Sequence, residues 1–235
     1  MRLEATKYRI LSEVHEIRAV VFDLDGTLLD RRATFRRHVE LLIERHPDVF
    51  RDTGDRDRVA ELVELDRNGF ADRGEYYESV EAHLGLTPGS AGTLWKYFER
   101  NFPEECVPMP NLIESFERLR ARGLKLGLIT NGRVSIQARK IDGLAIRPYF
   151  ESIVVSEAVG IEKPDPRIFA IALAELDVPA SAAAYVGDNP EADVLGAKAS
   201  GMLAVWRRDP FWPEPIEADR VIDDLAELVP MFGDE

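Results

Sequence analysis

Two aspartates separated by a single residue follow a short apolar run near the start of the chain. They are Asp23 and Asp25, within the segment VVFDLDGTLLD that spans residues 20–30. In an extended strand, residues i and i+2 project to the same side, so both carboxylates can face one site beyond the end of the strand. Adjacent carboxylates repel each other unless a cation joins them or one of them holds a proton. The pattern therefore indicates a hard metal ion with an acid/base pair, although a strand followed by an ordinary Asp-Gly turn is the alternative.

A further aspartate ends a second apolar run in the same way. Asp188 closes the segment AAAYVGD, so Asp23 and Asp188 can reach one cation at the same edge of a parallel sheet. Mg²⁺ suits such a position because it takes few carboxylates, retains waters and accepts a substrate phosphate oxygen. Asp193 fits a helix start, where Asn189 would be the N-cap and an acidic side chain would offset the helix dipole.

Two other segments carry groups suited to holding a phosphoryl group. In LKLGLITNG, the hydroxyl of Thr130 and free backbone N–H groups around Asn131 and Gly132 can bind phosphoryl oxygens. Taken alone, Thr-Asn-Gly is more often just a turn. In SEAVGIEKPDPRIF, the ammonium group of Lys163 can screen the repulsion between an anionic nucleophile and an anionic phosphoryl group. A solvated surface lysine is the alternative at this position.

Together these segments resemble the haloacid dehalogenase-like (HAD) superfamily, and they occur in the order of that family's motifs. The motifs are DxDGT after the first strand, a Ser or Thr after the second, a Lys before the fourth, and GDxxxxD after the fourth. The resemblance covers roughly residues 17–30 and 109–228. It implies that Asp23 attacks phosphorus and forms an aspartyl-phosphate, while Asp25 acts as the general acid/base.

The same resemblance implies a phosphate site and a metal site. The phosphate would be held by Thr130, Asn131, Gly132 and Lys163, and Lys163 would also be catalytic. Mg²⁺ is the expected cofactor. It would be held by Asp23, the backbone carbonyl of Asp25, Asp188 and Asp193, the last either directly or through water.

Position 25 separates the possible reactions within this superfamily. The founding dehalogenases resemble DxYGT rather than DxDGT, so Asp25 favours phosphoryl transfer over cleavage of a carbon–halogen bond. A phosphate leaving group needs a proton, whereas a halide does not. We therefore expect a Mg²⁺-dependent phosphatase, a phosphoric monoester hydrolase, that acts on a small phosphorylated metabolite. A sugar phosphomutase would use the same motifs, and a haloacid dehalogenase or a non-catalytic binding module is a further alternative.

The elements that must position these residues alternate between strands and helices. Short apolar, β-branched runs predict buried parallel strands at Val20–Phe22, Leu124–Ile129, Ile153–Val155, Ala183–Val186 and Leu203–Trp206, with a short sixth strand at Val221–Ile222. Helical spacing between the later runs completes a β-α-β alternation. The sequence thus predicts the α/β class, with a doubly wound, Rossmann-like parallel sheet as the catalytic core, formed by residues 1–29 and 108–235.

Residues 30–107 interrupt this alternation and contain no convincing strand. Apolar residues recur there at helical spacing, which predicts about four helices inserted between the first and second strands. Their position matches the first cap type of the HAD superfamily, so we expect an all-helical cap domain. Leaving-group contacts must then come from the cap and its hinges. The candidates are Arg31, Arg73, Tyr76 and Arg133, each of which has packing or surface charge as its plainer role.

Composition limits the partners. With 45% hydrophobic residues and 31% charged residues, the chain is typical of a globular protein. Its net charge of -13 argues against binding to nucleic acid or an anionic membrane, since both would need a basic face. Cys106 is the only cysteine, so no internal disulfide can form, and the scattered histidines argue against zinc. No apolar stretch approaches the length of a membrane span, and we expect a cytoplasmic location. The oligomeric state is left open.

Overall fold

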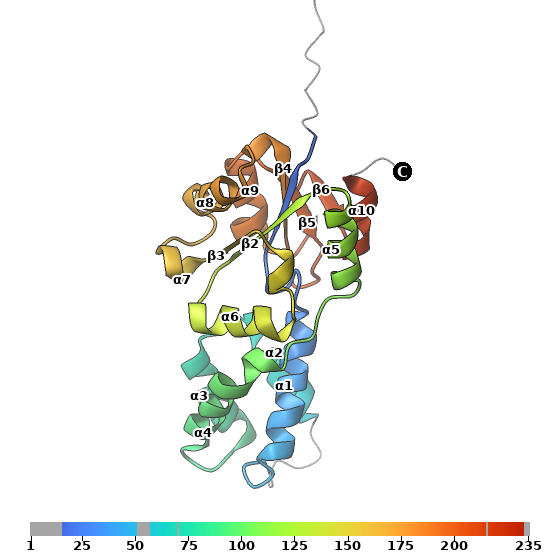
Figure 1. Ribbon diagram of the computed structural model, residues 1–235. Coiled ribbons are helices and arrows are strands. Elements are labelled where there is room, and N and C mark those ends of the chain that lie inside the picture. Colours follow the sequence, from blue (N-terminus) through green and yellow to red (C-terminus); the bar gives the residue numbers. More distant parts are fainter. Residues whose placement is uncertain (1–15, 51–56, 70, 215, 233–235) are drawn as a thin grey trace, which may run out of the picture.

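The fold is built on a parallel sheet. The structure is a computed structural model, and it describes residues 16–50, 57–69, 71–214 and 216–232. In this part of the chain the sheet has six strands in the order β3-β2-β1-β4-β5-β6 (Figure 1). They are β1 (Ala19–Phe22), β2 (Lys125–Thr130), β3 (Ser152–Val155), β4 (Ala183–Gly187), β5 (Leu203–Arg207) and β6 (Arg220–Ile222). All neighbouring strands pair in parallel. Each strand begins and ends within one residue of its predicted bounds, and the predicted α/β class is confirmed.

Apolar side chains on both faces of the sheet explain why these runs form strands inside the molecule. Along β1, Val20 and Phe22 belong to one hydrophobic cluster, while Ala19 and Val21 belong to another, as the alternation of side chains in a strand requires. The first cluster is closed by α5 (Leu112–Ala121) and α10 (Leu228–Met231), and the second by α8 (Pro166–Leu176) and α9 (Gly196–Ala199). The sheet is therefore a buried layer that holds its strand ends firmly in place.

In the described part of residues 30–107, four helices pack together beyond one edge of the sheet (Figure 1). They are α1 (Arg31–Arg45), α2 (Arg58–Leu65), α3 (Arg73–Leu84) and α4 (Ser90–Asn101), with 3₁₀ turns at Arg67–Gly69 and Phe102–Glu104. The side chains of Asp30, Asp57 and Asp72 cap the first three helices by accepting N–H groups of their first turns. The apolar faces form a hydrophobic cluster of their own, which includes Phe35 and Phe98. We call residues 30–107 the helical insertion.

Two adjacent segments join the helical insertion to the sheet. Leu29 and Pro108 form an antiparallel bridge. The N–H of Asp30 donates to the carbonyl of Val107 at 2.9 Å, which ties the entry of the insertion to its exit. Any movement of the insertion relative to the sheet must therefore bend this narrow junction.

The carboxyl ends of β1, β2 and β4 meet at the edge of the sheet that faces the helical insertion. β1 lies in the middle of the sheet, with β2 and β3 on one side and β4, β5 and β6 on the other. The strand order therefore reverses at β1, and open α/β sheets bind ligands at such a switch point. Asp23, Asn131 and Asp188 directly follow these three strands.

The remaining elements are α6 (Val134–Gly143), α7 (Ser156–Val159), a π-helical turn at Pro190–Leu195 and 3₁₀ turns at Arg147–Tyr149, Ala180–Ala182 and Leu225–Glu227. Among the helices that the structure describes, none is long and apolar enough to span a bilayer.

Candidate active site

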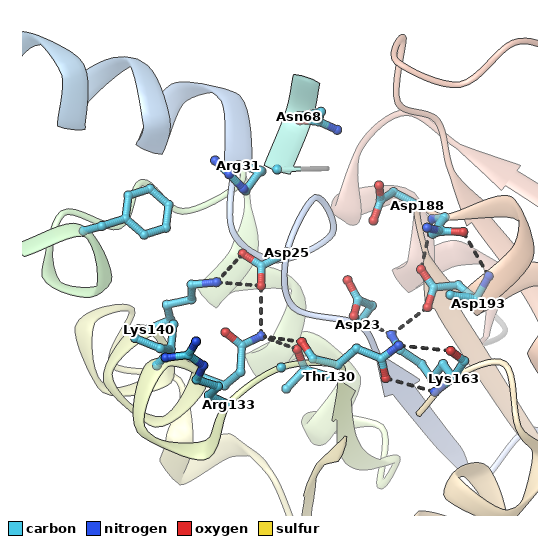
Figure 2. Close-up of a pocket in the computed structure, with 18 of the residues that line it drawn as sticks. Asp23, Asp25, Arg31, Asn68, Thr130, Arg133, Lys140, Lys163, Asp188 and Asp193 are labelled. Carbon is cyan, nitrogen blue, oxygen red and sulfur yellow. Dashed lines mark hydrogen bonds and ion pairs between the residues drawn. The ribbon is translucent and has the colours of Figure 1, made fainter. Parts of the chain in front are cut away.

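A cleft of about 510 Å³ lies between the carboxyl edge of the sheet and the helical insertion (Figure 2). Its wall on the sheet side carries Asp23, Asp25, Thr130, Asn131, Gly132, Arg133, Lys163, Asp188 and Asp193. Its wall on the insertion side carries Arg31, Asn68, Trp95, Phe98 and Phe102. The fold therefore gathers all four motif segments, which are far apart in the sequence, around one cavity.

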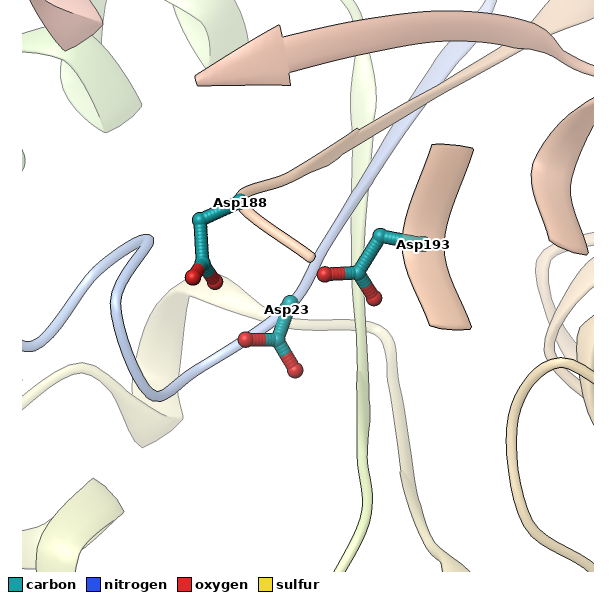
Figure 3. Close-up of side chains that lie close together, drawn as sticks. All are labelled: Asp23, Asp188 and Asp193. Carbon is teal, nitrogen blue, oxygen red and sulfur yellow. The ribbon is translucent and has the colours of Figure 1, made fainter. Parts of the chain in front are cut away.

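Asp23, Asp188 and Asp193 form a buried cluster of carboxylates (Figure 3). One oxygen from each residue lies within 4.8 Å of one from each of the others. Two glycines allow this approach: a Cβ atom on Gly26 would lie 2.6 Å from Cγ of Asp188, and one on Gly187 would lie 2.4 Å from Cγ of Asp193. Gly26 also has a φ of +88°, which other residues rarely adopt. The turn after β1 and the end of β4 thus require glycine.

The cluster concentrates negative charge where water screens it poorly. Burial, opposed by the charge of Lys163 and reinforced by that of Asp193, raises the pKa of Asp23 to about 7. Burial and the charges of Asp193 and Asp23 also raise the pKa of Asp188 well above its usual range. Such carboxylates are stabilised in their ionised form by a hard cation that prefers oxygen ligands. The donor set of the cluster therefore fits Mg²⁺.

Lys163 reaches the cluster from the segment before α8. Its Nζ donates to Oδ1 of Asp23 at 2.5 Å, to Oδ1 of Asp193 at 2.7 Å and to the hydroxyl of Tyr185 at 2.8 Å. Burial alone would lower the pKa of Lys163, but the attraction of Asp193 and Asp23 outweighs burial and holds that pKa above its ordinary value. The lysine stays charged beside the expected nucleophile. Tyr185 is absent from the sequence prediction, and its signal was a polar side chain inside an otherwise apolar strand.

Thr130, Asn131 and Gly132 line the cleft where β2 ends, and their polar groups have partners within the protein. Oγ1 of Thr130 accepts from the side chain of Gln137 at 2.5 Å. The Asn131 side chain donates to the carbonyl of Lys163 at 3.0 Å and accepts from its N–H at 2.9 Å. The N–H of Gly132 donates to the hydroxyl of Ser156, the first residue of α7, at 2.9 Å. This N–H was expected to be free to bind phosphoryl oxygens, but in the structure it has a partner. Asn131 thus fixes the backbone that carries Lys163.

The side chain of Asp25 turns away from the carboxylate cluster and toward α6 (Figure 2). Nζ of Lys140 donates to both of its oxygens at 2.8 Å, and Nε2 of Gln137 donates to Oδ2 at 2.9 Å. Burial would raise the pKa of Asp25, but the charge of Lys140 and the hydrogen bond from Gln137 outweigh burial and lower that pKa. The sequence analysis missed both α6 residues. Their spacing of i and i+3 on one helix face, just after Thr-Asn-Gly, was the available signal.

Arg31 and Arg133, two of the residues predicted to contact the leaving group, line the cleft. Nη2 of Arg31 donates to Asp66 at 2.9 Å, and its guanidinium group lies over the rings of Phe35 and Phe102. Nη1 of Arg31 is buried and has no hydrogen-bond partner among the described residues. Arg133 is exposed at the start of α6. Both arginines are placed where a substrate could meet them.

Tyr76, also predicted as a leaving-group contact, does not line the cleft. The side chain is buried in the helical insertion, where its ring meets those of Phe35 and Tyr77 and its hydroxyl donates to the carbonyl of Leu62 at 3.0 Å. The apolar face of α3 packs against its neighbours, and Tyr76 lies on that face. Arg73 begins α3, and its side chain lies outside the part of the chain that the structure describes.

The buried aspartates and the lysine at the switch point of a parallel sheet, facing a helical insertion, define an α/β enzyme with a carboxylate-rich site. Residues 17–201 match the haloacid dehalogenase-like hydrolases, and the chain belongs to this family. The chain is 31% identical over 200 residues to a glyceraldehyde 3-phosphate phosphatase from Methanopyrus kandleri, covering 80% of this chain and 83% of the relative. It is 33% identical over 237 residues to a ribulose-1,5-bisphosphate 5-phosphatase from Halopiger xanaduensis, covering 92% and 99%.

Solved structures agree with this family at the level of the fold. The magnesium-bound crystal structure of the putative HAD hydrolase YfnB from Bacillus subtilis superposes with a TM-score of 0.74 at 23% identity, covering 92% of this chain and 99% of that one. A dehalogenase with an intermediate complex gives a TM-score of 0.71 at 21% identity, covering 94% and 100%. The family match over residues 17–201, and not these structures, confirms the resemblance drawn from the motifs as family membership.

Proposed function

We propose that this chain is a Mg²⁺-dependent phosphatase that hydrolyses a small phosphorylated metabolite through an aspartyl-phosphate on Asp23. The observation that carries the proposal is the 2.5 Å contact between Asp23 and Lys163, within the carboxylate cluster at the end of β1. An anionic nucleophile needs a fixed positive charge beside it to approach an anionic phosphoryl group. Family members named as phosphatases support the same assignment.

The metal site would be formed by Asp23, Asp188 and the backbone carbonyl of Asp25, with Asp193 as a direct or water-mediated partner. The convergence of three buried carboxylates and the raised pKa values of Asp23 and Asp188 support this assignment. When bound, Mg²⁺ neutralises the cluster and polarises the phosphoryl group. Lys163 remains the protein's own cation at the nucleophile.

In the first half-reaction, a carboxylate oxygen of Asp23 attacks phosphorus in line with the leaving oxygen. The bond between phosphorus and the leaving oxygen breaks, and Asp25 gives its proton to that oxygen, which departs as an alcohol. The negative charge of the arriving phosphoryl group raises the pKa of Asp25 from its lowered value, so that Asp25 can carry this proton. Thr130, Asn131, Gly132 and Lys163 hold the transferring group or the segments that contact it.

In the second half-reaction, ionised Asp25 takes a proton from a water molecule whose oxygen attacks phosphorus. The bond between phosphorus and Asp23 breaks. Inorganic phosphate leaves, the Asp23 carboxylate is restored, and Asp25 is protonated again. The sum of both half-reactions is hydrolysis of a phosphate monoester by one water.

The helical insertion, residues 30–107, acts in this proposal as a cap domain that selects the leaving group. The expected phosphate-holding groups lie on the sheet side of the cleft, at the end of β2 and in the segment before α8, so leaving-group contacts would come from elsewhere. The insertion supplies the opposite wall, where Arg31 and the aromatic side chains lie. Arg31 and Arg133 would meet a leaving group with an anionic substituent, because Nη1 of Arg31 has an unused donor. Closure of the insertion would also exclude bulk water from the intermediate.

A single turnover of p-nitrophenyl phosphate in ¹⁸O-labelled water, with Mg²⁺ and enzyme in excess, tests this function. Because water attacks phosphorus, we expect label in the released phosphate and none in the peptide that carries Asp23. Mass spectrometry of both products measures this. In a dehalogenase-type reaction, water attacks the carbonyl of an Asp23 ester, so label in the Asp23 carboxylate would overturn the proposal. Absence of label from both products would exclude hydrolysis through this intermediate.

A further inference from the structure

We propose that Lys140 and Gln137 are positioning residues for Asp25, which hold the acid/base carboxylate in the orientation that serves the leaving oxygen. This inference rests on the proposed function, because it assigns to Asp25 the role of proton donor in the first half-reaction. Both residues lie on α6, outside the motif segments. Both also line the cleft.

The contacts leave the Asp25 carboxylate little freedom to rotate. Nζ of Lys140 lies 2.8 Å from each carboxylate oxygen, so it holds the group symmetrically. Nε2 of Gln137 lies 2.9 Å from Oδ2. The same amide nitrogen also donates to Oγ1 of Thr130 at 2.5 Å and to the carbonyl of Asn131 at 3.2 Å. Gln137 therefore links the acid/base residue to the end of β2, where the phosphoryl group is expected.

Lys140 is itself held in place from the insertion side. Its side chain is 7% exposed, and its ammonium group lies 5.7 Å from the centre of the Phe102 ring. Phe102 belongs to the segment through which the chain returns from the helical insertion. The carboxylate of Asp25 thus pairs with Lys140, whose own position depends on α6 and on its contact with Phe102 of the insertion.

Positioning matters for Asp25 because it lies on a turn beyond the end of β1. Asp23 and Asp25 repel each other when both are ionised, so Asp25 gains from a partner on the opposite side. A proton donor must lie within hydrogen-bond reach of the leaving oxygen. Lys140 and Gln137 occupy the far side of the carboxylate and restrict it to orientations that keep it at the cleft.

The alternative is that this ion pair only attaches α6 to the sheet. The two roles differ in their dependence on the leaving group. A positioning role affects release of an alkoxide, which needs a proton, far more than release of p-nitrophenolate, which is stable as an anion. A merely structural role lowers both rates equally, because a disturbed site loses phosphoryl transfer as a whole.

The experiment compares glycerol 2-phosphate with p-nitrophenyl phosphate in the presence of Mg²⁺. The rate of alcohol or phenol release in a single turnover, with enzyme in excess, isolates the first half-reaction. For Lys140→Met we expect a loss of about 100-fold with glycerol 2-phosphate and less than about 3-fold with p-nitrophenyl phosphate. Lys140→Arg, which keeps the charge, should retain most of the wild-type rate. Gln137→Leu should show the same selectivity with a smaller loss.

Two comparisons make the result decisive. Lys198→Met removes another ion-paired lysine, on α9, and should change neither rate. If Lys140 acts through Asp25, the double variant Asp25→Asn with Lys140→Met should be no slower than Asp25→Asn alone. Equal losses on both substrates, no loss on either, or additive losses in the double variant would overturn the inference. If Lys140→Met fails to fold by circular dichroism, Lys140→Arg and Gln137→Leu are judged by the same criteria. Failure of the proposed function appears separately, as the absence of labelled phosphate from the wild type.

Discussion

The sheet-side wall of the cleft and the insertion-side wall differ in the side chains that they present. On the sheet side, Asp23, Asp188, Asp193 and Lys163 are buried charged groups at or near strand ends, and they contact or repel one another directly. On the insertion side, the guanidinium group of Arg31 lies over the rings of Phe35 and Phe102 and pairs with Asp66. One wall concentrates charge, and the other presents aromatic side chains beside the buried Arg31.

In the function that we propose, this difference divides two tasks between the two walls. Bond making needs charged groups held within narrow limits, and buried strand ends provide such positions. Selection of a leaving group needs a surface that can vary and move, and an insertion joined through a narrow junction provides it.

Replacement of the nucleophile should stop the reaction and leave the insertion intact. Asp23→Asn has nearly the same shape, but an amide neither attacks phosphorus nor carries the charge that Lys163 contacts. We expect turnover of p-nitrophenyl phosphate to fall by more than about 10⁴-fold, with an unchanged circular dichroism spectrum. Activity within tenfold of wild type would remove Asp23 as the nucleophile.

Removal of divalent metal should impair the sheet-side wall of the cleft, as replacement of Asp23 does. We expect EDTA to lower turnover by more than about 10³-fold and Mg²⁺ to restore it, since the three buried carboxylates are otherwise offset only in part by the ammonium group of Lys163. Mg²⁺ should also raise the melting temperature of the wild type, but not of Asp188→Asn, which lacks one carboxylate. Full activity in EDTA, with metal shown to be absent by elemental analysis, would contradict the metal site.

A change on the insertion side should affect selection rather than chemistry. For Arg31→Met we expect kcat/KM to fall about 10- to 100-fold for 2-phosphoglycolate, because a charge-assisted hydrogen bond to its carboxylate is lost. The values for ethyl phosphate and p-nitrophenyl phosphate should stay within about threefold. Arg36→Met is the matched control, because Arg36 lies exposed on the same helix and pairs with Glu40. Equal losses on all three substrates would show that Arg31 is structural.

The smallest effect concerns stability without metal. Burial raises the pKa of Asp23 from 3.8 to about 7, so at intermediate pH the folded protein holds a proton that the unfolded chain releases. Stability should therefore fall as pH rises from about 4 to 7 and level off above that. In EDTA we expect the free energy of unfolding to be about 2–3 kcal/mol lower at pH 7.5 than at pH 5, measured with urea. Asp23→Asn should show a flatter profile, and an unchanged slope would contradict the assignment.

Local patterns in the sequence were enough to predict the sheet and the carboxylates that lie together at its edge. Continuous apolar, β-branched runs are typical of buried parallel strands, so these runs predicted the bounds of β1 to β6, and the ends of two of them placed Asp23 and Asp188 at one edge. The motif order indicated the family, which the comparison confirms. The helical spacing within residues 30–107 likewise predicted the four helices that are observed.

The tertiary structure decided which side chains contact one another across long separations. Lys140 and Gln137 lie more than a hundred residues from Asp25 in the sequence, and no local pattern links them. Tyr76 shows a limit of local patterns. The helical spacing around it predicted a helix, but this spacing does not reveal whether an aromatic side chain packs inside a helical bundle or lines a cleft. In the structure Tyr76 is buried inside the bundle. The sequence by itself therefore determined the elements and the polar side chains that follow the strands. The tertiary packing that brings α6 beside the turn after β1 determined the orientation of Asp25, because Lys140 and Gln137 of α6 hold its carboxylate.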